Sequence, residues 1–156
     1  MVEMGEGAEL SLVNEEIENF FPRLVSERYR IASPRTPRYN CIAWAAGDDT
    51  AWWEPDPLDL YYWPYDVPRQ PTLEAYTQAF RTLGYTPCDT AKVEAGFEKI
   101  AIYVDNTGRP THLARQLPDG KWTSKLGKLE DIEHPTLEGL TGSVYGSVRL
   151  ILRRRI

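Results

Sequence analysis

The chain has 156 residues, a hydrophobic fraction of 42% and a charged fraction of 26%, which is the composition of one ordinary globular domain. Its net charge of −5 argues against a nucleic-acid-binding domain, which would carry a basic face. No apolar run approaches the roughly 20 residues that span a bilayer, and residues 1–9 lack the basic and apolar regions of a secretory signal, so we expect a cytoplasmic protein that binds neither nucleic acid nor membrane.

We expect residues 1–9, rich in acids and glycines, to be frayed or disordered and residues 10–156 to form one domain. Apolar residues recur at near-helical spacing from Leu10 to Leu24. Asn14, followed by two acids, suits the start of a helix because a polar side chain caps free amides. Pro22 limits the end of that helix.

After an extended lead-in, the segment Tyr39–Gly47 predicts a short alanine-rich helix with Cys41 in its first turn. Aromatic and proline residues follow from Trp52 to Tyr65. Because disorder would leave these rings in water, we predict an ordered loop, either a lid packed on a sheet or a surface for substrate. Thr72–Gly84 predicts a second helix, capped by its threonine and ended by its glycine.

Strand patterns separated by turn signals dominate the second half of the chain. The predicted strands cover Glu98–Asp105, Pro110–Leu117, Lys121–Lys125 and Tyr145–Leu152. Between the last two, we predict a helical turn at Leu137–Leu140 and an acidic loop whose His134 is either exposed or at the edge of a site. Helices followed by an antiparallel meander predict an α+β domain.

The two cysteines and two histidines are too few for a zinc-finger ligand set, and no CxxC or HxxxH spacing supports a metal site. We therefore expect no metal and no cofactor. A disulfide between Cys41 and Cys88 is not expected in a reducing cytosol. Cys88 has no basic residue nearby to lower its pKa, so its predicted role is structural.

Cys41 has two interpretations. A helix start stabilises a thiolate, and either the Cys41 amide or Asn40 would then stabilise an oxyanion. The alternative is a small buried residue at the start of a helix. His112 lies on a later predicted strand, where an imidazole can serve a nucleophile as a base. Its own alternative is a histidine that packs in the sheet.

A third group usually orients such an imidazole. Gln116 projects to the same strand face as His112 but lies roughly 13 Å along the strand. Ser124 and Thr123, on the next strand, can accept a hydrogen bond from an imidazole N–H. These three residues are the candidates, because no acid or asparagine is clearly placed for the role.

Four further residues are candidates for substrate binding. Trp44 lies on the helix of Cys41, and Trp122 is expected to cover either the core or the wall of the site. Arg115 and Lys125 alternate with apolar neighbours, so they either face solvent or bind a carboxylate-bearing substrate.

Several motifs resemble an uncharacterised bacterial family, a domain of unknown function, over nearly the whole chain from about Arg30. The motifs are Tyr39-Asn40-Cys41-Ile42-Ala43-Trp44-Ala45, His112-x-Ala114-Arg115-Gln116 and Trp122-Thr123-Ser124-Lys125-Leu126-Gly127. More distantly, the helix of Cys41 and these strands resemble papain-like and NlpC/P60-like cysteine hydrolases. That resemblance implies Cys41 as nucleophile, His112 as base, and N-terminal helices packed on a small antiparallel sheet. The NlpC/P60 pattern has a histidine on the strand that here includes Lys99–Tyr103, and this chain has none there, so the papain-like order fits better.

Two hypotheses follow. In the first, the protein is a cysteine hydrolase of amidase or peptidase type, in which Cys41 attacks the carbonyl of a peptide or amide substrate and His112 takes the thiol proton. In the second, it is a catalytically inactive binding or protein-interaction module on the same fold, which the missing third group favours. In either case we expect a monomer or a weak homo-oligomer.

Overall fold

The computed structural model describes residues 6–156. The first helix, α1 (Glu6–Phe20), begins before the predicted start, so Asn14 lies inside it, and it ends just before Pro22 as expected. Residues 6–9 are therefore helical, and the rest of the predicted frayed terminus lies outside the described residues. The 3-10 helix η1 (Pro22–Ser26) follows.

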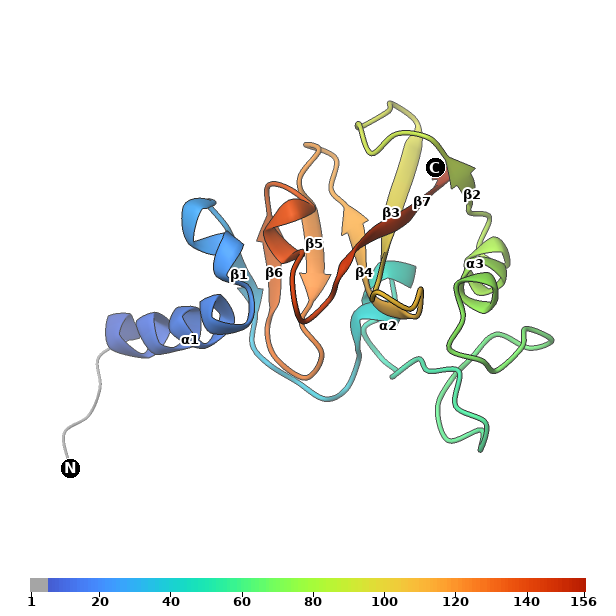
Figure 1. The fold of residues 1–156 in the computed structure, drawn as a ribbon, viewed down its shortest axis with the longest axis horizontal. Helices are drawn as coiled ribbons and strands as arrows, with labels where there is room; N and C mark the ends of the chain where they lie inside the picture. Colours follow the sequence, from blue (N-terminus) through green and yellow to red (C-terminus); the bar gives the residue numbers. More distant parts are fainter. Residues whose placement is uncertain (1–5) are drawn as a thin grey trace.

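One seven-stranded sheet forms the centre of the molecule, and all its neighbouring strands are antiparallel (Figure 1). Its order is β1-β6-β5-β4-β3-β7-β2. The strands are β1 (Arg30–Ser33), β2 (Thr86–Cys88), β3 (Phe97–Val104), β4 (Pro110–Gln116), β5 (Trp122–Lys125), β6 (Asp131–His134) and β7 (Ser147–Arg155). The predicted α+β class and the meander from β3 to β5 are confirmed.

Three short strands differ from the prediction. β6 forms where an acidic loop was predicted, because its side chains alternate between the faces and pair with those of β5. β1 forms within the extended lead-in and pairs with β6. β2 forms where no strand was predicted, and it tolerates Pro87 because it is an edge strand.

The two helices predicted in the middle of the chain are confirmed as α2 (Cys41–Ala46) and α3 (Leu73–Arg81). Asn40 caps α2 by accepting a hydrogen bond from the amide of Ala43 (3.2 Å), and Thr72 caps α3 in the same way. Gly47 ends α2 in the left-handed conformation, with φ of 84°.

The predicted arrangement of N-terminal helices packed on a small sheet is wrong. In Figure 1, α1 projects away from one end of the molecule, while α2 and α3 come from the middle of the chain. α2 contacts β4 and β5, and α3 contacts β2. A second 3-10 helix, η2 (Glu138–Leu140), packs against η1. None of the helices in residues 6–156 is long and apolar enough to cross a membrane.

The sheet separates two apolar clusters, because successive strand residues point to opposite faces. The α2–α3 cluster contains side chains of both helices together with Ile100, Ile102 and Leu113 of the sheet. The α1–η2 cluster contains side chains of α1, η1 and η2 together with Ala101, Tyr103 and Ala114. The face on which a strand residue lies therefore decides which helices it can meet.

Candidate functional site

Asn40 holds Cys41 in place at the first position of α2. Its side-chain oxygen accepts from Ala43 and from the amide of Trp53, and its nitrogen donates to the carbonyl of Trp53 at 2.6 Å. This buried side chain thus ties the start of α2 to the segment that follows the helix. These contacts give Asn40 a structural role, and its expected role toward an oxyanion stays a prediction.

Cys41 is half-buried and packs against the α2–α3 cluster. Burial raises the pKa of its thiol to about 11, although the backbone amides of Leu113 and Ile42 act in the opposite direction. The thiol is therefore protonated at neutral pH. Nucleophilic cysteines have a lowered pKa, so this shift favours the structural interpretation of Cys41.

His112 lies on β4 and is fully buried. Its ring stacks on Tyr145, with centroids 4.1 Å apart and planes 5° apart, and lies 5.3 Å from the ring of Tyr103. Neither ring nitrogen has a hydrogen-bond partner within the described part of the chain. Burial, with a smaller contribution from His134, lowers the pKa of His112 well below its ordinary value. This imidazole is an uncharged packing group.

Cys41 and His112 are not hydrogen-bonded to each other, although the Cys41 thiol lies against the backbone of Leu113, the next residue along β4. His112 contacts Tyr103 of the α1–η2 cluster, whereas Cys41 packs against the cluster on the opposite face of the sheet. With both nitrogens of His112 unpartnered among the described residues, the thiol makes no hydrogen bond to it. A base must reach hydrogen-bond contact with the proton that it removes, and this pair does not do so.

The three candidate orienting residues have other partners. Ser124 pairs with Nε2 of His134 at 2.8 Å. Thr123 accepts from the indole N–H of Trp44 at 3.0 Å, and Gln116 donates to the carbonyl of Ala91 at 2.6 Å. Each of these three side chains therefore forms a hydrogen bond to another part of the fold, and none of these bonds is to His112.

His134 is fully buried, so the prediction of an exposed loop residue is wrong. Its Nδ1 donates to the carbonyl of Thr136 at 2.8 Å, which leaves Nε2 to accept from Ser124. Burial lowers the pKa of His134 to about 4. The sequence signal that could have revealed this position is the alternation of Ile132 and His134 along one face of a strand.

Two of the four candidate substrate residues are parts of the core. Trp122 belongs to the α1–η2 cluster. Lys125 is fully buried, its ammonium donates to the carbonyls of Gly127 (2.6 Å) and Leu129, and burial lowers its pKa. Lys125 therefore closes a turn and does not face solvent.

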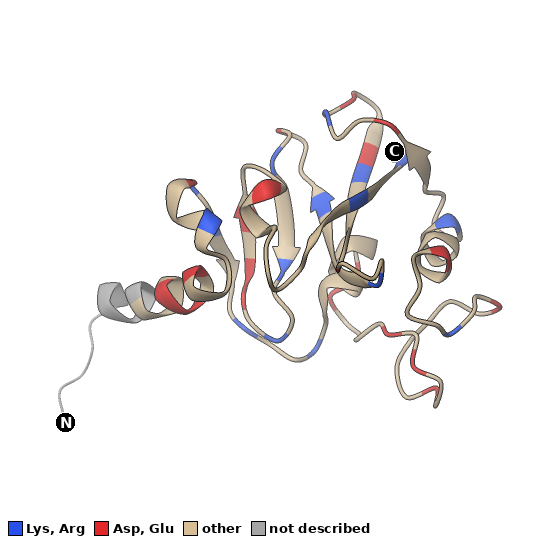
Figure 2. Ribbon diagram, viewed as in Figure 1, with Lys and Arg blue, Asp and Glu red and all other residues tan. Residues whose placement is uncertain are grey.

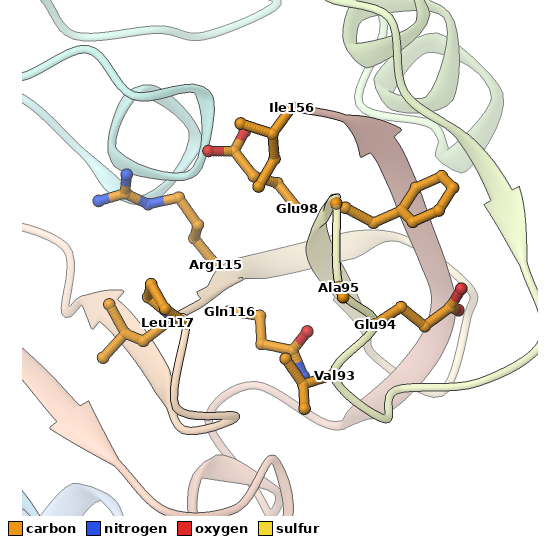
Figure 3. A pocket seen from close by; sticks show the side chains of 11 residues that line it. Val93, Glu94, Ala95, Glu98, Arg115, Gln116, Leu117 and Ile156 are labelled. Atoms are coloured by element: carbon orange, nitrogen blue, oxygen red, sulfur yellow. The ribbon is translucent and has the colours of Figure 1, made fainter.

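The other two candidates, Trp44 and Arg115, lie together. The guanidinium carbon of Arg115 is 5.0 Å from the centroid of the Trp44 ring, a cation–π contact. Arg115 also lines a cavity of about 350 Å³ at the end of β3 and β4 (Figure 3). Among residues 6–156 there is no group of three or more His, Cys, Asp and Glu side chains that could hold a metal ion.

The segment Trp52–Arg69, here called the aromatic loop, is ordered as predicted. Trp53 and Trp63 are buried and anchor it in the α2–α3 cluster. Between and beyond these anchors, large apolar side chains face solvent. They are Leu58 (75% exposed), Leu60 (70%), Tyr61 (42%), Tyr62 (51%) and Tyr65 (96%).

The family model described as "Domain of unknown function (DUF7689)" matches residues 30–153. The match begins at β1 and ends within β7, so it includes strands of the whole sheet and leaves α1 and η1 outside. The expected resemblance to a family of unknown function is thereby confirmed. No curated protein and no solved structure matches the chain, so neither comparison supports a papain-like relative.

Proposed function

The chain belongs to the DUF7689 family, and we propose that this domain is a protein-interaction module whose contact surface is the tip of the aromatic loop. The observation that carries the proposal is the exposure of five large apolar side chains, from Leu58 to Tyr65, on one ordered segment. An exposed apolar patch on a soluble domain marks a surface that binds a partner.

The loop is held in shape by a network around Asp56. The carboxylate of Asp56 accepts from the backbone amides of Leu60 (2.7 Å) and Tyr61 (3.2 Å). Arg69 donates to Asp56 and Asp59, and it also donates to the carbonyl of Tyr61. These amides keep the pKa of Asp56 below its ordinary value. The polar groups of the loop are thus satisfied internally, which leaves its apolar groups to face outward.

A fixed loop favours binding because the entropy of ordering it is not lost again on association. Tyrosines suit such a surface, since they supply large contact areas with few rotatable bonds. The loop therefore has the properties of a preorganised interface: a rigid backbone and exposed aromatic and aliphatic side chains.

The charge around this surface indicates the chemistry of its partner. Between Arg38 and Arg69 the sequence has six acids and no lysine or arginine, and Arg69 itself pairs with two of these acids, Asp56 and Asp59. The acids are Asp48, Asp49, Glu54, Asp56, Asp59 and Asp66, and Figure 2 shows acidic positions along this segment. A partner that presents apolar side chains ringed by lysine and arginine is complementary to it.

The test uses fluorescently labelled helical and extended peptides that combine leucine and phenylalanine with lysine, titrated with the full chain and followed by anisotropy. The matched controls replace each lysine by glutamate. We expect the basic peptides to bind and the acidic ones to bind at least tenfold more weakly, because the rim of the loop is acidic.

Two loop variants, Leu60→Ser and Tyr65→Ser, should weaken binding of the basic peptides at least tenfold, since each removes apolar contact area. Val25→Ser, which removes an apolar side chain that is 66% exposed elsewhere on the surface, is the control and should leave binding unchanged. Equal binding of basic and acidic peptides, or equal loss in the Val25 variant, would refute the proposal.

A further inference from the structure

A cavity lies where β3 begins and β4 ends, and no residue of the aromatic loop lines it. Its wall contains charged side chains as well as apolar ones. It is bounded by Val93–Glu98 on one side, Arg115–Pro118 on another and Ile156. Its volume of about 350 Å³ is at the lower end of the range for small-molecule sites. In Figure 3, Arg115 reaches from β4 toward the side where Glu98 and Ile156 lie, while Gln116 and Val93 lie on the other side.

Both acidic side chains in the cavity wall are already paired. Glu94 accepts from Lys99 and from Arg153, each at 2.7 Å, and these cations hold the pKa of its carboxyl low. Glu98 accepts from Arg154 at 2.8 Å. The negative charge of the wall is therefore neutralised by basic side chains that come from β3 and β7.

Arg115 is the exception to this pairing. Its Nε is buried without a hydrogen-bond partner, and its guanidinium forms no ion pair with any of the described residues. Its contact is the face of Trp44. The buried Nε–H of Arg115 therefore lacks an acceptor, and an anion that enters the cavity can supply both an acceptor and a counter-charge.

We propose that this cavity binds a carboxylate that carries a small apolar group, with Arg115 as its counter-charge. A planar guanidinium matches a carboxylate through two parallel N–H···O bonds. A single unpaired cation balances a single negative charge, which fits a carboxylate better than a phosphate. Leu117, Phe97 and Ile156 supply apolar wall for the attached group.

This chemistry is shared by small apolar acids and by the C-terminal residue of a peptide, and the experiment distinguishes the two. The probes are N-acetylleucine and acetyl-Ala-Ala-Leu, each compared with its C-terminal amide, and inorganic phosphate. Binding is followed by NMR, using the Nε–H signal of Arg115 and the indole N–H signal of Trp44 in the full chain.

We expect both acids to shift these two signals in a saturable way and to bind at least tenfold more tightly than their amides. The tighter of the two acids identifies the source of the carboxylate. Acids and amides that bind equally would overturn the proposal, and so would phosphate that binds as tightly as the acids.

Arg115→Gln should weaken binding of the acids at least tenfold, and Arg115→Lys should weaken it by less, since lysine keeps the charge but loses the two parallel bonds. Arg109→Gln, at an exposed turn at the opposite end of β4, is the control and should bind as the native chain does. If Arg115→Gln unfolds, Arg115→Lys followed by the Trp44 signal still decides the question. Undiminished affinity in the lysine variant, with equal binding of the amides, refutes the site.

Discussion

The aromatic loop and the surroundings of His112 use aromatic residues in opposite ways. In the loop, carboxylate and guanidinium groups satisfy the backbone, while the side chains of Leu58, Leu60 and Tyr65 remain in water. Around His112, Tyr103 and Tyr145 are packed ring against ring, while both imidazole nitrogens stay unpartnered within the described residues. The first region leaves apolar surface free to bind, and the second leaves polar atoms buried at a cost to stability.

Trp63 and Tyr65 lie two residues apart in the aromatic loop, one buried and the other exposed, so substitutions of them test whether the loop has a distinct anchor and tip. Trp63→Ala should lower the free energy of unfolding by about 3–5 kcal/mol, because the ring is buried against Tyr76 and anchors the loop. Tyr65→Ala, at a side chain 96% exposed, should change it by less than about 0.5 kcal/mol. Urea denaturation measures both, and equal effects would show that the anchor and the tip are not distinct.

Acid should destabilise the region around His112. Both buried histidines have lowered pKa values, so the folded chain keeps them neutral while the unfolded chain protonates them below about pH 6.5. Their contribution to stability is complete above that pH and is lost as the pH falls toward 4. For His134 the loss should reach about 3 kcal/mol, from the shift to about 4. Unfolding free energies measured from pH 7 to 4.5 check this, and a flat profile would contradict it.

The rate at which Cys41 is alkylated distinguishes a reactive thiol from a structural one. With its pKa raised to about 11, Cys41 should react with iodoacetamide at pH 8 about 100-fold more slowly than a thiol at the ordinary value. The measurement is the rate against pH in Cys88→Ala, with Cys41→Ala as the blank. A rate that rises at low pH and depends on His112 would instead support the cysteine hydrolase.

The smallest expected effect concerns the unpartnered nitrogens of His112. His112→Phe keeps a ring stacked on Tyr145 and removes two buried polar atoms, so it should stabilise the fold by about 1 kcal/mol at pH 7. It should also reduce the loss of stability between pH 6.5 and 4.5. Urea denaturation of the variant at both pH values checks this, and destabilisation would mean that the nitrogens have partners in solution.

Local signals predicted the parts of the fold that depend on near neighbours in sequence. Asn40 and Thr72 cap their helices, Gly47 ends one, and the long strands around Ile102 and Leu113 follow their apolar runs. The strands β1, β2 and β6 were missed because they are short and exist only through partners far away in the chain. The pattern of a few neighbouring residues does not reveal such a strand, because its stability depends on its pairing partner.

The arrangement of the candidate site depends on a feature that the sequence does not contain. The sequence places His112 and Gln116 on one face of their strand, but it does not reveal whether α2 packs on that face or on the face of Leu113. The fold puts α2 on the second, next to Arg115 and Thr123. A shift of one residue along β4 therefore decides which helices a side chain can meet, and it places the His112 side chain on the face opposite to α2.

The central position of β3 also has a consequence for synthesis on the ribosome. One edge of β3 pairs with β4, which follows it directly, and the other pairs with β7, which ends at Arg155. Until β7 has emerged, the middle of the sheet has an open edge of backbone amides and carbonyls, and β2 has no neighbour at all. The nascent chain therefore cannot complete its sheet before β7 has been synthesised, so folding of this domain depends on contacts of long sequence separation.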